Sequence, residues 1–345
     1  MRKGQNPAKM GLPAYRPKRV GIALLSWIPS EDGYFSQSLE ILKYQIASIR
    51  NSVNECDLVI FDNGSCLAVQ AELKNLHAQG LIEVLILSRV NMGKTGALNW
   101  LLASLPNQLI AYADGDVLFR PGWLEAAEKI LIAFPNAGLV TSQPCLFDIL
   151  RGKGQAWRSL EKESNIEIVE QTLEASAIEE YARGIGLDAE QIGVLKTQPV
   201  KVVEERESGV RAVIGASHMQ FVMWRETARQ IIPLPSEYAL NKDEDAYLNQ
   251  QVDRLGLLHL STLEPFVYHM GNRLDEHALA EIRRLGLAEI INQPLTAQGT
   301  PYTRSLDPVK LRAFLFISRL SRWSVFRNLT RRLYNFLFEF FAQEK

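Results

Sequence analysis

The sequence predicts an α/β protein with an open, mostly parallel sheet flanked by helices. In the first 134 residues, four short apolar runs alternate with segments whose apolar residues recur at helical spacing. Each run is continuously apolar, which is typical of strands buried on both faces. Such alternation implies right-handed crossovers between parallel strands. The loops after the strands then meet at one edge of the sheet, so we expect a binding crevice there.

The first two units each contain one strand and one helix. A strand over residues 20–25 is followed by a helix over 38–51. A second strand, over residues 57–61, leads through the turn 62–65 into a helix that ends at Gly80. Glycine commonly closes a helix, because it adopts the left-handed backbone conformation without steric cost.

The third and fourth units repeat this pattern. A strand over residues 82–87 precedes a helix over 95–105, and a strand over 109–113 precedes a helix that ends near residue 134. The fourth strand runs directly into Asp114-Gly115-Asp116. Alternate carboxylates on a bent turn can bind one hard cation, and the glycine leaves room for a phosphate. We therefore expect a metal-diphosphate site, although an ordinary Asp-Gly turn has the same pattern.

The second half of the chain interrupts this alternation. Residues 151–209 are charged, rich in Glu and mostly helical in spacing, which predicts a helical insertion between two parts of the sheet. Strands are expected again over 210–214 and 221–224. A helix begins at residues 243–245 and ends at Gly256, with acidic residues where the helix dipole favours them.

Both ends of the chain are expected to lie outside the sheet domain. Residues 1–17 predict a flexible basic arm, and residues 276–345 a C-terminal helical region. From about residue 311, aromatic and leucine side chains follow helical spacing with arginines between them, which is typical of a helix in a membrane interface. The alternative is a helix that packs on the main domain or on a second subunit.

The composition excludes several classes of protein. With a net charge of -1 over 345 residues, the chain lacks the basic excess of a dedicated nucleic-acid binder. Its three cysteines have neither metal spacing nor an even count, so we expect reduced thiols in a cytoplasmic protein. We also expect no membrane-spanning helix, because no window of about 18 uncharged apolar residues occurs.

Polar motifs fall at the predicted strand ends and helix starts in a definite order. They are Phe61-Asp62-Asn63-Gly64-Ser65, Asn91-x-Gly-Lys94-x-x-Ala97-x-Asn99, Asp114-Gly-Asp116, Glu244-Asp245 and His269-x-Gly-Asn272. In order and approximate spacing, this set resembles an inverting glycosyltransferase of family 2 with the GT-A fold. The resemblance covers about residues 18–275 and implies that the predicted sheet is a GT-A sheet.

The resemblance also implies residues that bind the donor. Asp62 would contact the nucleobase, Asp114 would lie near the ribose or the metal, and Asp116 with His269 would bind Mn²⁺ or Mg²⁺. The full set of expected donor-binding residues is Ser26, Asp62, Asn91, Lys94 and Asp114. Two alternatives remain open, because His269 could be a hydrogen-bonded histidine at a strand end and Lys94 an exposed lysine at a helix start.

The remaining roles concern the acceptor. Asp245 would be the general base, as the second member of the Glu-Asp pair, although an acid in the first turn of a helix is also a common cap and Asp243 and Glu244 are rivals. The expected pocket for the acceptor and the donor sugar is formed by Gly215, Ala216, Ser217 and Glu244.

The sequence therefore predicts a metal-dependent transferase that moves a sugar, UDP-linked in preference, to a hydroxyl of a glycan or lipid-linked acceptor. It would work in the cytoplasm, peripheral to the inner face of the cell membrane. One departure concerns Ser26-Trp27-Ile28-Pro29, which replaces the usual base-contacting turn and leaves the nucleotide open. Two alternatives are a nucleotidyltransferase that forms sugar nucleotides and a catalytically silent scaffold that binds glycan or membrane.

Overall fold

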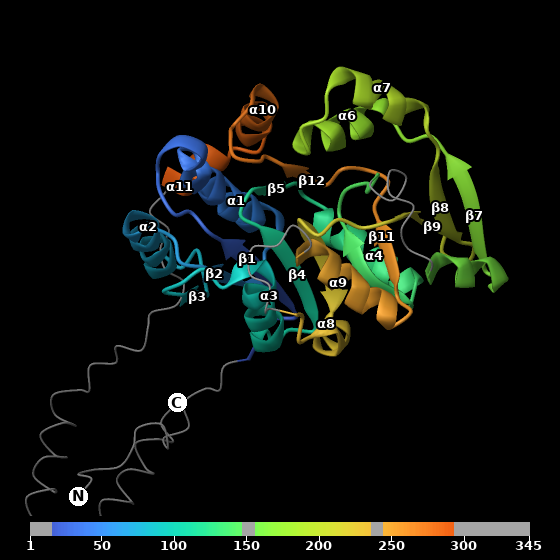
Figure 1. The fold of residues 1–345 in the computed structure, drawn as a ribbon, viewed down its shortest axis with the longest axis horizontal. Coiled ribbons are helices and arrows are strands. Elements are labelled where there is room, and N and C mark those ends of the chain that lie inside the picture. Colours follow the sequence, from blue (N-terminus) through green and yellow to red (C-terminus); the bar gives the residue numbers. More distant parts are fainter. Residues whose placement is uncertain (1–15, 147–155, 236–243, 293–345) are drawn as a thin grey trace, which may run out of the picture. The chain divides into compact units, whose positions relative to one another are not determined.

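The structure is a computed structural model that describes residues 16–146, 156–235 and 244–292 (Figure 1). Apart from Arg16, these residues belong to one compact unit, Pro17–Ala297. The predicted N-terminal arm, apart from its last residues, and the predicted basic aromatic helix lie outside the described residues.

The first half of the chain forms the predicted strand-helix units. Their elements are β1 (Val20–Ser26), α1 (Ser38–Ser52), β2 (Cys56–Asp62), α2 (Leu67–Ala78), β3 (Val84–Leu87), α3 (Gly93–Ser104) and β4 (Leu109–Asp114). A short 3-10 helix, η2 (Gly33–Phe35), lies between β1 and α1. The four strands are parallel to their neighbours in the order β3-β2-β1-β4. Ser26 pairs with Asp62, and Leu25 with Asp114, so the predicted site residues share one edge of the sheet.

The second half widens this sheet with strands of both directions. Its elements are β5 (Val117–Phe119), α4 (Trp123–Ala133), β6 (Ala137–Thr141), β9 (Val210–Ile214), β10 (Gln220–Trp224), α8 (Arg225–Ile231), α9 (Glu244–Arg254) and β11 (Leu258–Ser261). The complete order of the large sheet is β3-β2-β1-β4-β10-β6-β11-β9-β8-β7. β10 runs antiparallel to both β4 and β6, whereas β6 and β11 are parallel.

The insertion contains strands as well as helices, which differs from the mostly helical content expected from the sequence. It consists of η3 (Ala156–Lys162), β7 (Ile166–Gln171), α6 (Ala175–Gly184), α7 (Ala189–Thr197) and β8 (Val200–Glu205). β8 pairs antiparallel with both β7 and β9 and so extends the large sheet. The many glutamates of this segment belong partly to the solvated strand face, where Glu170 pairs with Lys201 and Glu204 with Arg211.

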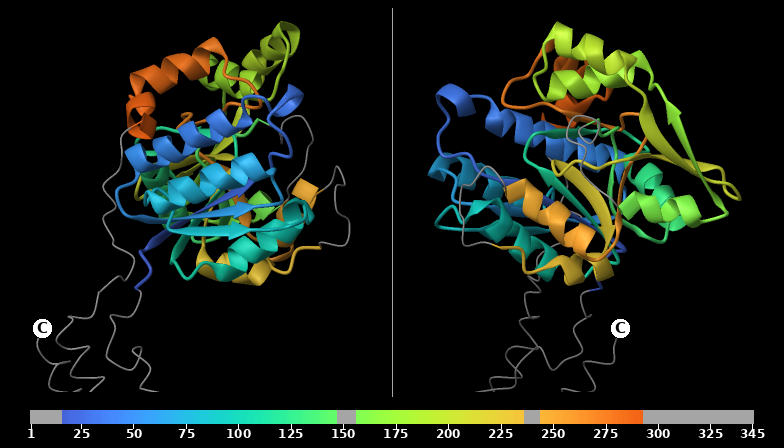
Figure 2. Two further views of the ribbon diagram at one scale, coloured as in Figure 1. Left: turned by 90° about the vertical axis from the view of Figure 1, so that its left-hand side faces the viewer. Right: turned by 45° about the vertical axis from the view of Figure 1, so that its right-hand side comes forward.

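Helices cover both faces of the large sheet (Figure 2). On one face, α1, α2 and α4 pack on side chains such as Leu24 and Ile60. On the other, α3, α8 and α9 pack on alternate residues of the same strands, such as Ala23 and Phe61. Both faces are thus buried, which explains why these strands are continuously apolar in sequence.

A second, two-stranded sheet lies beside the large one. β12 (Val267–His269) pairs antiparallel with β5, and His269 faces Val117 in the register. The helices α10 (Glu276–Arg284) and α11 (Leu287–Asn292) follow, and their apolar side chains pack with Ile41 of α1 and Leu118 of β5. The compact unit therefore extends beyond residue 275.

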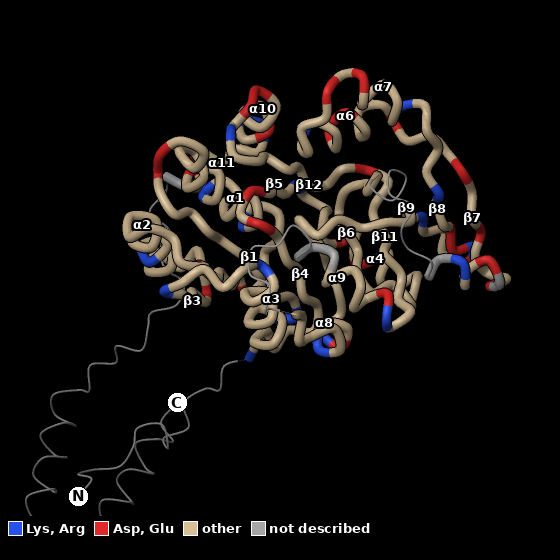
Figure 3. Tube along the Cα trace, viewed as in Figure 1, with Lys and Arg blue, Asp and Glu red and all other residues tan. Residues whose placement is uncertain are grey.

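Charge and hydropathy can be followed along the described residues. Basic and acidic residues are interspersed along the chain trace, in keeping with a net charge of -1 (Figure 3). In the part of the chain that the structure describes, no helix is long and apolar enough to cross a bilayer.

Candidate functional site

The carboxyl ends of β1 and β2 carry the first part of the candidate site. Asp62 is fully buried, and its Oδ2 atom accepts hydrogen bonds from the Ser65 backbone N–H (3.2 Å) and from Gln70 Nε2 (3.0 Å). Among the described residues, neither Asp62 Oδ1 nor the buried Ser26 Oγ has a hydrogen-bond partner. A buried acceptor without a partner is costly, so these two atoms are suited to contact a ligand.

The turn after β2 is locked to the turn before α3. Asn63 Nδ2 donates to Asn91 Oδ1 (2.9 Å), and Asn63 Oδ1 accepts from the Met92 backbone N–H (2.9 Å). Asn91 Oδ1 also accepts from the Gly93 N–H (2.9 Å), so the structure uses this predicted donor-binding oxygen to hold the two turns together. Gly64 belongs to the turn after β2, and its backbone φ is 88°.

The end of β4 holds a charged pair. Asp114 Oδ2 accepts from Lys94 Nζ (2.8 Å), and Asp114 Oδ1 accepts from the Tyr112 hydroxyl (2.6 Å). Lys94 and Asp114, which the sequence predicted separately, are thus one ion pair. Both carboxylate oxygens of Asp114 already accept hydrogen bonds from protein groups. Of the two expected roles of Asp114, contact with the donor ribose is therefore favoured over direct coordination of the metal.

The third part of the site joins β5 to β12. His269 Nε2 lies 3.1 Å from Asp116 Oδ2, and the backbone carbonyl of Asp116 accepts from the Met270 N–H (2.8 Å). The other ring nitrogen of His269, Nδ1, lies 2.7 Å from the carbonyl oxygen of Gly184 in α6. The strand pairing therefore brings together two predicted metal ligands that are 153 residues apart in sequence.

The surroundings of His269 favour its charged form. Burial lowers the pKa of His269, but the hydrogen bond to Asp116 and the charges of Asp116 and Asp114 outweigh it and raise the pKa to about 8. Asp116 Oδ1 is buried and has no hydrogen-bond partner within the described ranges. A cation bound between Asp116 and His269 would give this oxygen a partner.

The Asp116–His269 pair fits a divalent metal that also binds substrate. No group of three or more His, Cys, Asp or Glu suited to a metal occurs in the described residues, so this part of the chain offers the two ligands Asp116 and His269. Mg²⁺ typically binds through one or two carboxylates plus substrate phosphates and keeps several waters. Carboxylate and water oxygens also suit Mn²⁺, and imidazole is a common ligand of divalent transition metals.

The predicted acceptor residues are only partly described. Glu244 and Asp245 form the start of α9, but their side chains lie outside the described part of the chain. The turn 215–217 is held by a reciprocal contact, in which the Ser217 N–H donates to Thr141 Oγ1 (2.8 Å) and Thr141 Oγ1 donates to the Ser217 carbonyl (3.0 Å). Gly215 opens this turn, and its N–H donates to the carbonyl of His259.

Two residues of the site were not identified from the sequence. Tyr112 lies two positions before Asp114 on β4, so the period of a strand places both on one face. Gln45 is a fully buried polar residue of α1, and its Nε2 donates to the Asp114 carbonyl (2.6 Å). A polar residue on the apolar face of a predicted helix was the signal that could have revealed Gln45.

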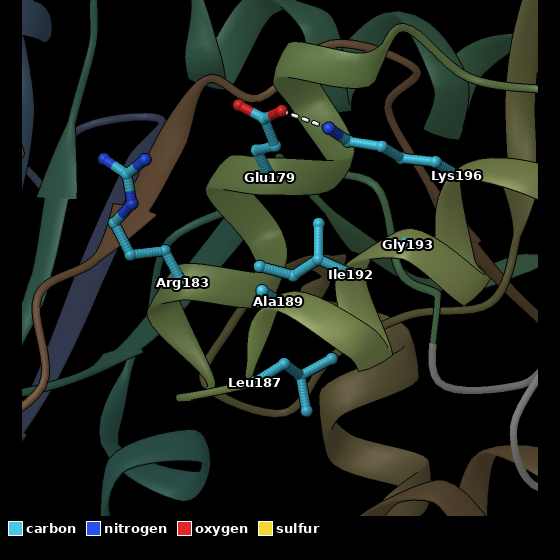
Figure 4. A pocket seen from close by; sticks show the side chains of 7 residues that line it. All are labelled: Glu179, Arg183, Leu187, Ala189, Ile192, Gly193 and Lys196. Atoms are coloured by element: carbon cyan, nitrogen blue, oxygen red, sulfur yellow. Dashed lines mark hydrogen bonds and ion pairs between the residues drawn. The ribbon is translucent and has the colours of Figure 1, made fainter.

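A separate hollow lies on the insertion. It has a volume of about 430 Å³ and is lined by Glu179, Arg183, Leu187, Ala189, Ile192, Gly193 and Lys196. Figure 4 shows the ion pair of Glu179 with Lys196 that joins α6 to α7 at this hollow. None of the predicted site residues lines it.

Comparison with known proteins finds a family model that matches part of the chain. Residues 36–176 match the model of glycosyl transferase family 2. This region includes the turns of Asp62, Lys94, Asp114 and Asp116, whereas His269 lies outside it. No curated protein matches the chain.

Several solved structures resemble the chain at low sequence identity. S. aureus TarS 1–349 is 11% identical, with 79% of this chain and 66% of that chain covered and a TM-score of 0.43. The mannosyltransferase PcManGT from Pyrobaculum calidifontis, in complex with GDP-Man and Mn²⁺, is 12% identical, with 95% and 89% covered and a TM-score of 0.45. GalNAc-T7 with UDP, GalNAc and Mn²⁺ is 11% identical, with 74% and 44% covered and a TM-score of 0.45. The chain therefore spans less than half of GalNAc-T7 and just under two thirds of the TarS fragment.

The family match confirms the resemblance that the motifs indicated, and it supports a transferase of sugars over the nucleotidyltransferase and scaffold alternatives. The helix-flanked sheet with its site at the strand ends agrees with the expected fold. Residues 36–176 of this chain are therefore similar to glycosyl transferase family 2, and the helix-flanked α/β sheet agrees with the GT-A fold expected from the sequence.

Proposed function

We propose that the protein is a metal-dependent, inverting glycosyltransferase that moves a sugar from a nucleotide-diphosphate donor to a hydroxyl group. The observation that carries this proposal is the pair of Asp116 and His269, 3.1 Å apart, with one buried oxygen of Asp116 left without a partner in the described residues. Asp116 lies two residues after Asp114, the last residue of β4, and the pairing of β12 with β5 brings His269 beside it.

Asp116 and His269 would hold Mn²⁺ or Mg²⁺, and this cation would supply positive charge that neutralises the departing diphosphate. Asp114 supports the site from the neighbouring strand. Its carboxylate is fixed by Tyr112 and Lys94, so it can present its remaining lone pairs to a donor ribose without first changing its conformation. Lys94 adds a positive charge at the same edge.

Asp62 is the residue that we propose for contact with the nucleobase. Its Oδ2 is held by two hydrogen bonds, while its Oδ1 is buried and without a partner in the part that the structure describes. A fixed acceptor of this kind suits a base that presents a ring N–H, as uracil does. Thymine and guanine also present a ring N–H, whereas cytosine does not, so this contact favours these three bases over cytosine, and a UDP-sugar is the first donor that we propose.

Asp245 would act as the general base. The first turn of α9 places it on the helix that packs beside α3, whose N-terminus carries Lys94. Asp245 would take the proton from the acceptor hydroxyl while the hydroxyl oxygen attacks the anomeric carbon. A single displacement opposite to the departing nucleotide inverts the configuration of that carbon.

The acceptor is proposed to be a glycan or a lipid-linked sugar at the cytoplasmic face of a membrane. The small residues Gly215, Ala216 and Ser217 leave room at the edge of the sheet for the acceptor and the donor sugar, together with Glu244. The basic aromatic segment beyond residue 311 supports a peripheral membrane position, because such a helix binds anionic lipid.

Donor turnover tests this function. The protein would be incubated with UDP-, GDP- and dTDP-sugars with Mn²⁺ or with EDTA, and release of the nucleoside diphosphate would be measured. We expect release from one donor class, dependent on Mn²⁺ and on a hydroxyl acceptor, with product of inverted anomeric configuration by proton NMR. Product of retained configuration would contradict the inverting mechanism.

The general base has its own test. Asp245→Asn should lower kcat by about 10² to 10⁴-fold, the usual contribution of general acid-base catalysis, while the donor still binds. The matched variant Asp253→Asn, further along the same helix, should leave kcat unchanged. Equal activity of Asp245→Asn and the unchanged protein would exclude Asp245 as the base.

A further inference from the structure

The insertion touches the candidate metal site at Gly184. Gly184 is the last residue of α6, and its carbonyl oxygen lies 2.7 Å from His269 Nδ1. A Cβ atom at position 184 would lie 3.0 Å from His269 Cβ and 3.2 Å from the His269 carbonyl oxygen. Both distances are shorter than most contacts that a Cβ atom makes, so a methyl group at position 184 would require α6 or His269 to shift by a few tenths of an ångström.

An ion-pair cluster holds α6 in this position. Arg120, the residue after β5, donates from Nη1 to Glu180 of α6 (2.6 Å) and to the carbonyl of Pro265 (2.7 Å). Its Nε atom donates to Glu281 of α10 (2.8 Å). Glu180 is one helical turn before Gly184, and Pro265 lies just before β12. Arg120 therefore ties the C-terminal turn of α6 to the start of β12, the strand that carries His269.

The contact between His269 Nδ1 and the Gly184 carbonyl gives the two ring nitrogens of His269 different hydrogen-bonding roles. The carbonyl oxygen of Gly184 can only accept, so Nδ1 must carry the hydrogen in this contact. The lone pair of the neutral ring is then on Nε2, which faces Asp116. Histidines that bind metals usually donate their other N–H to a carbonyl or carboxylate, and this partner fixes the tautomer and the orientation of the ring.

We propose that Gly184 is a positioning residue for metal binding, and that the insertion, held by Arg120 and Glu180, orients His269 so that Nε2 faces the metal beside Asp116. The insertion is then a part of the donor site, in addition to any role in the choice of acceptor. This inference rests on the proposed metal dependence, and it adds a positioning residue to the same proposed site.

The test compares two glycine variants in the full-length protein. Gly184→Ala places a methyl group against His269, whereas Gly193→Ala in α7 places it where no atom lies within 4 Å. Loss of a partner behind a metal ligand typically weakens metal binding by about 10 to 100-fold. We expect at least a tenfold rise in the Mn²⁺ dissociation constant for Gly184→Ala, measured by electron paramagnetic resonance of free Mn²⁺, and a change below twofold for Gly193→Ala.

A second variant covers the case in which Gly184→Ala does not fold. Glu180→Gln keeps the shape of the side chain but weakens its contact with Arg120, and Arg120 retains Glu281 as a partner. This variant should also weaken Mn²⁺ binding, with circular dichroism confirming that it is folded. Unchanged Mn²⁺ affinity in folded Gly184→Ala and in Glu180→Gln would overturn the inference.

A readout without metal separates this inference from the proposed function. Nitrogen-15 NMR of the imidazoles, with His269 assigned by a His269→Gln variant, reports whether Nδ1 donates in a hydrogen bond. We expect a hydrogen-bonded Nδ1–H in the unchanged protein and in Gly193→Ala, and its loss in Gly184→Ala. Identical His269 spectra in all three would overturn the inference. Absence of Mn²⁺ binding by the unchanged protein would contradict the metal-dependent function, while these spectra would still decide the role of Gly184.

Discussion

Single residues at the strand ends fix the conformation of the turns around the proposed donor site. Asp62 is the last residue of β2 and Asn63 follows it, and the side chain of Asn63 joins this turn to Asn91 and Met92. Gly64 completes the turn with a φ of 88°, which residues with a side chain rarely adopt. The position of Asp62 therefore depends on neighbours that make no contact with substrate in the proposed function.

Gly64→Ala should destabilise the protein. The added Cβ would lie 2.9 Å from the carbonyl carbon of Val90, and the backbone would be strained as well, so we expect a loss of about 1 to 3 kcal/mol. Gly33→Ala is the matched variant, because Gly33 also has a positive φ, of 56°, but no atom lies within 4 Å of the added Cβ. Urea unfolding measures both; an equal loss at the two positions would show that the contact with Val90 is unimportant.

Several site residues could be predicted because they stand at the ends of apolar runs. Asp62 and Asp114 are the last residues of β2 and β4, and Asp116 lies two residues beyond Asp114; parallel strands deliver such residues to one edge. Gly184 could not be predicted, because its role depends on how the insertion packs on β12. The locking role of Asn63 was also missed, since it depends on the distance between two turns rather than on either turn alone.

At the level of elements, the pairing of β5 with β12 builds the proposed metal site. β5 has only three residues, and its sequence predicts no separate strand after Asp116. The first four strand-helix units were predicted because they are periodic and local. The strands of the insertion were not, because their charged residues resemble a solvated helix until they are paired with β9 across the sheet.

The junction of β5 with α10 should respond to acid. Arg284 and Arg120 lower the pKa of Glu281 to about 2, against the effect of burial. A carboxylate with a lowered pKa stabilises the folded state above its unfolded pKa, near 4.5, and this contribution is lost as the pH falls toward about 2.

Glu281→Gln should therefore reduce the pH dependence of stability between about pH 4.5 and 2. Thermal unfolding followed by circular dichroism at a series of pH values measures this dependence. Glu125→Gln, at an exposed position in the first turn of α4, is the control and should follow the unchanged protein. The same slope for all three proteins in this pH range would contradict the role of Glu281.

For the whole molecule, the proposed membrane position depends on the segment beyond residue 311, which lies outside the described residues. Its arginines include Arg319, Arg322 and Arg327. Each basic residue near an anionic surface contributes about 1 kcal/mol, so changing these three to Gln should weaken vesicle binding by about 3 kcal/mol, or roughly 100-fold.

Co-sedimentation of the full-length protein with vesicles that contain phosphatidylserine measures this binding. Vesicles of phosphatidylcholine alone are the control for attraction to negative charge. Equal binding to both kinds of vesicle, or no binding to either, would contradict the proposed peripheral position. Donor binding by the variant should stay unchanged, because the residues proposed to bind the donor all lie before residue 270.

The central claim is that Asp116 and His269 form the metal site that binds the donor diphosphate. The most direct test is calorimetric titration of UDP, GDP, dTDP and CMP, with and without Mn²⁺, into the unchanged protein and Asp116→Asn. We predict that one nucleoside diphosphate binds only when Mn²⁺ is present, and that Asp116→Asn abolishes this binding while the protein stays folded. Binding that is equally tight without Mn²⁺, or that survives in Asp116→Asn, would contradict the claim.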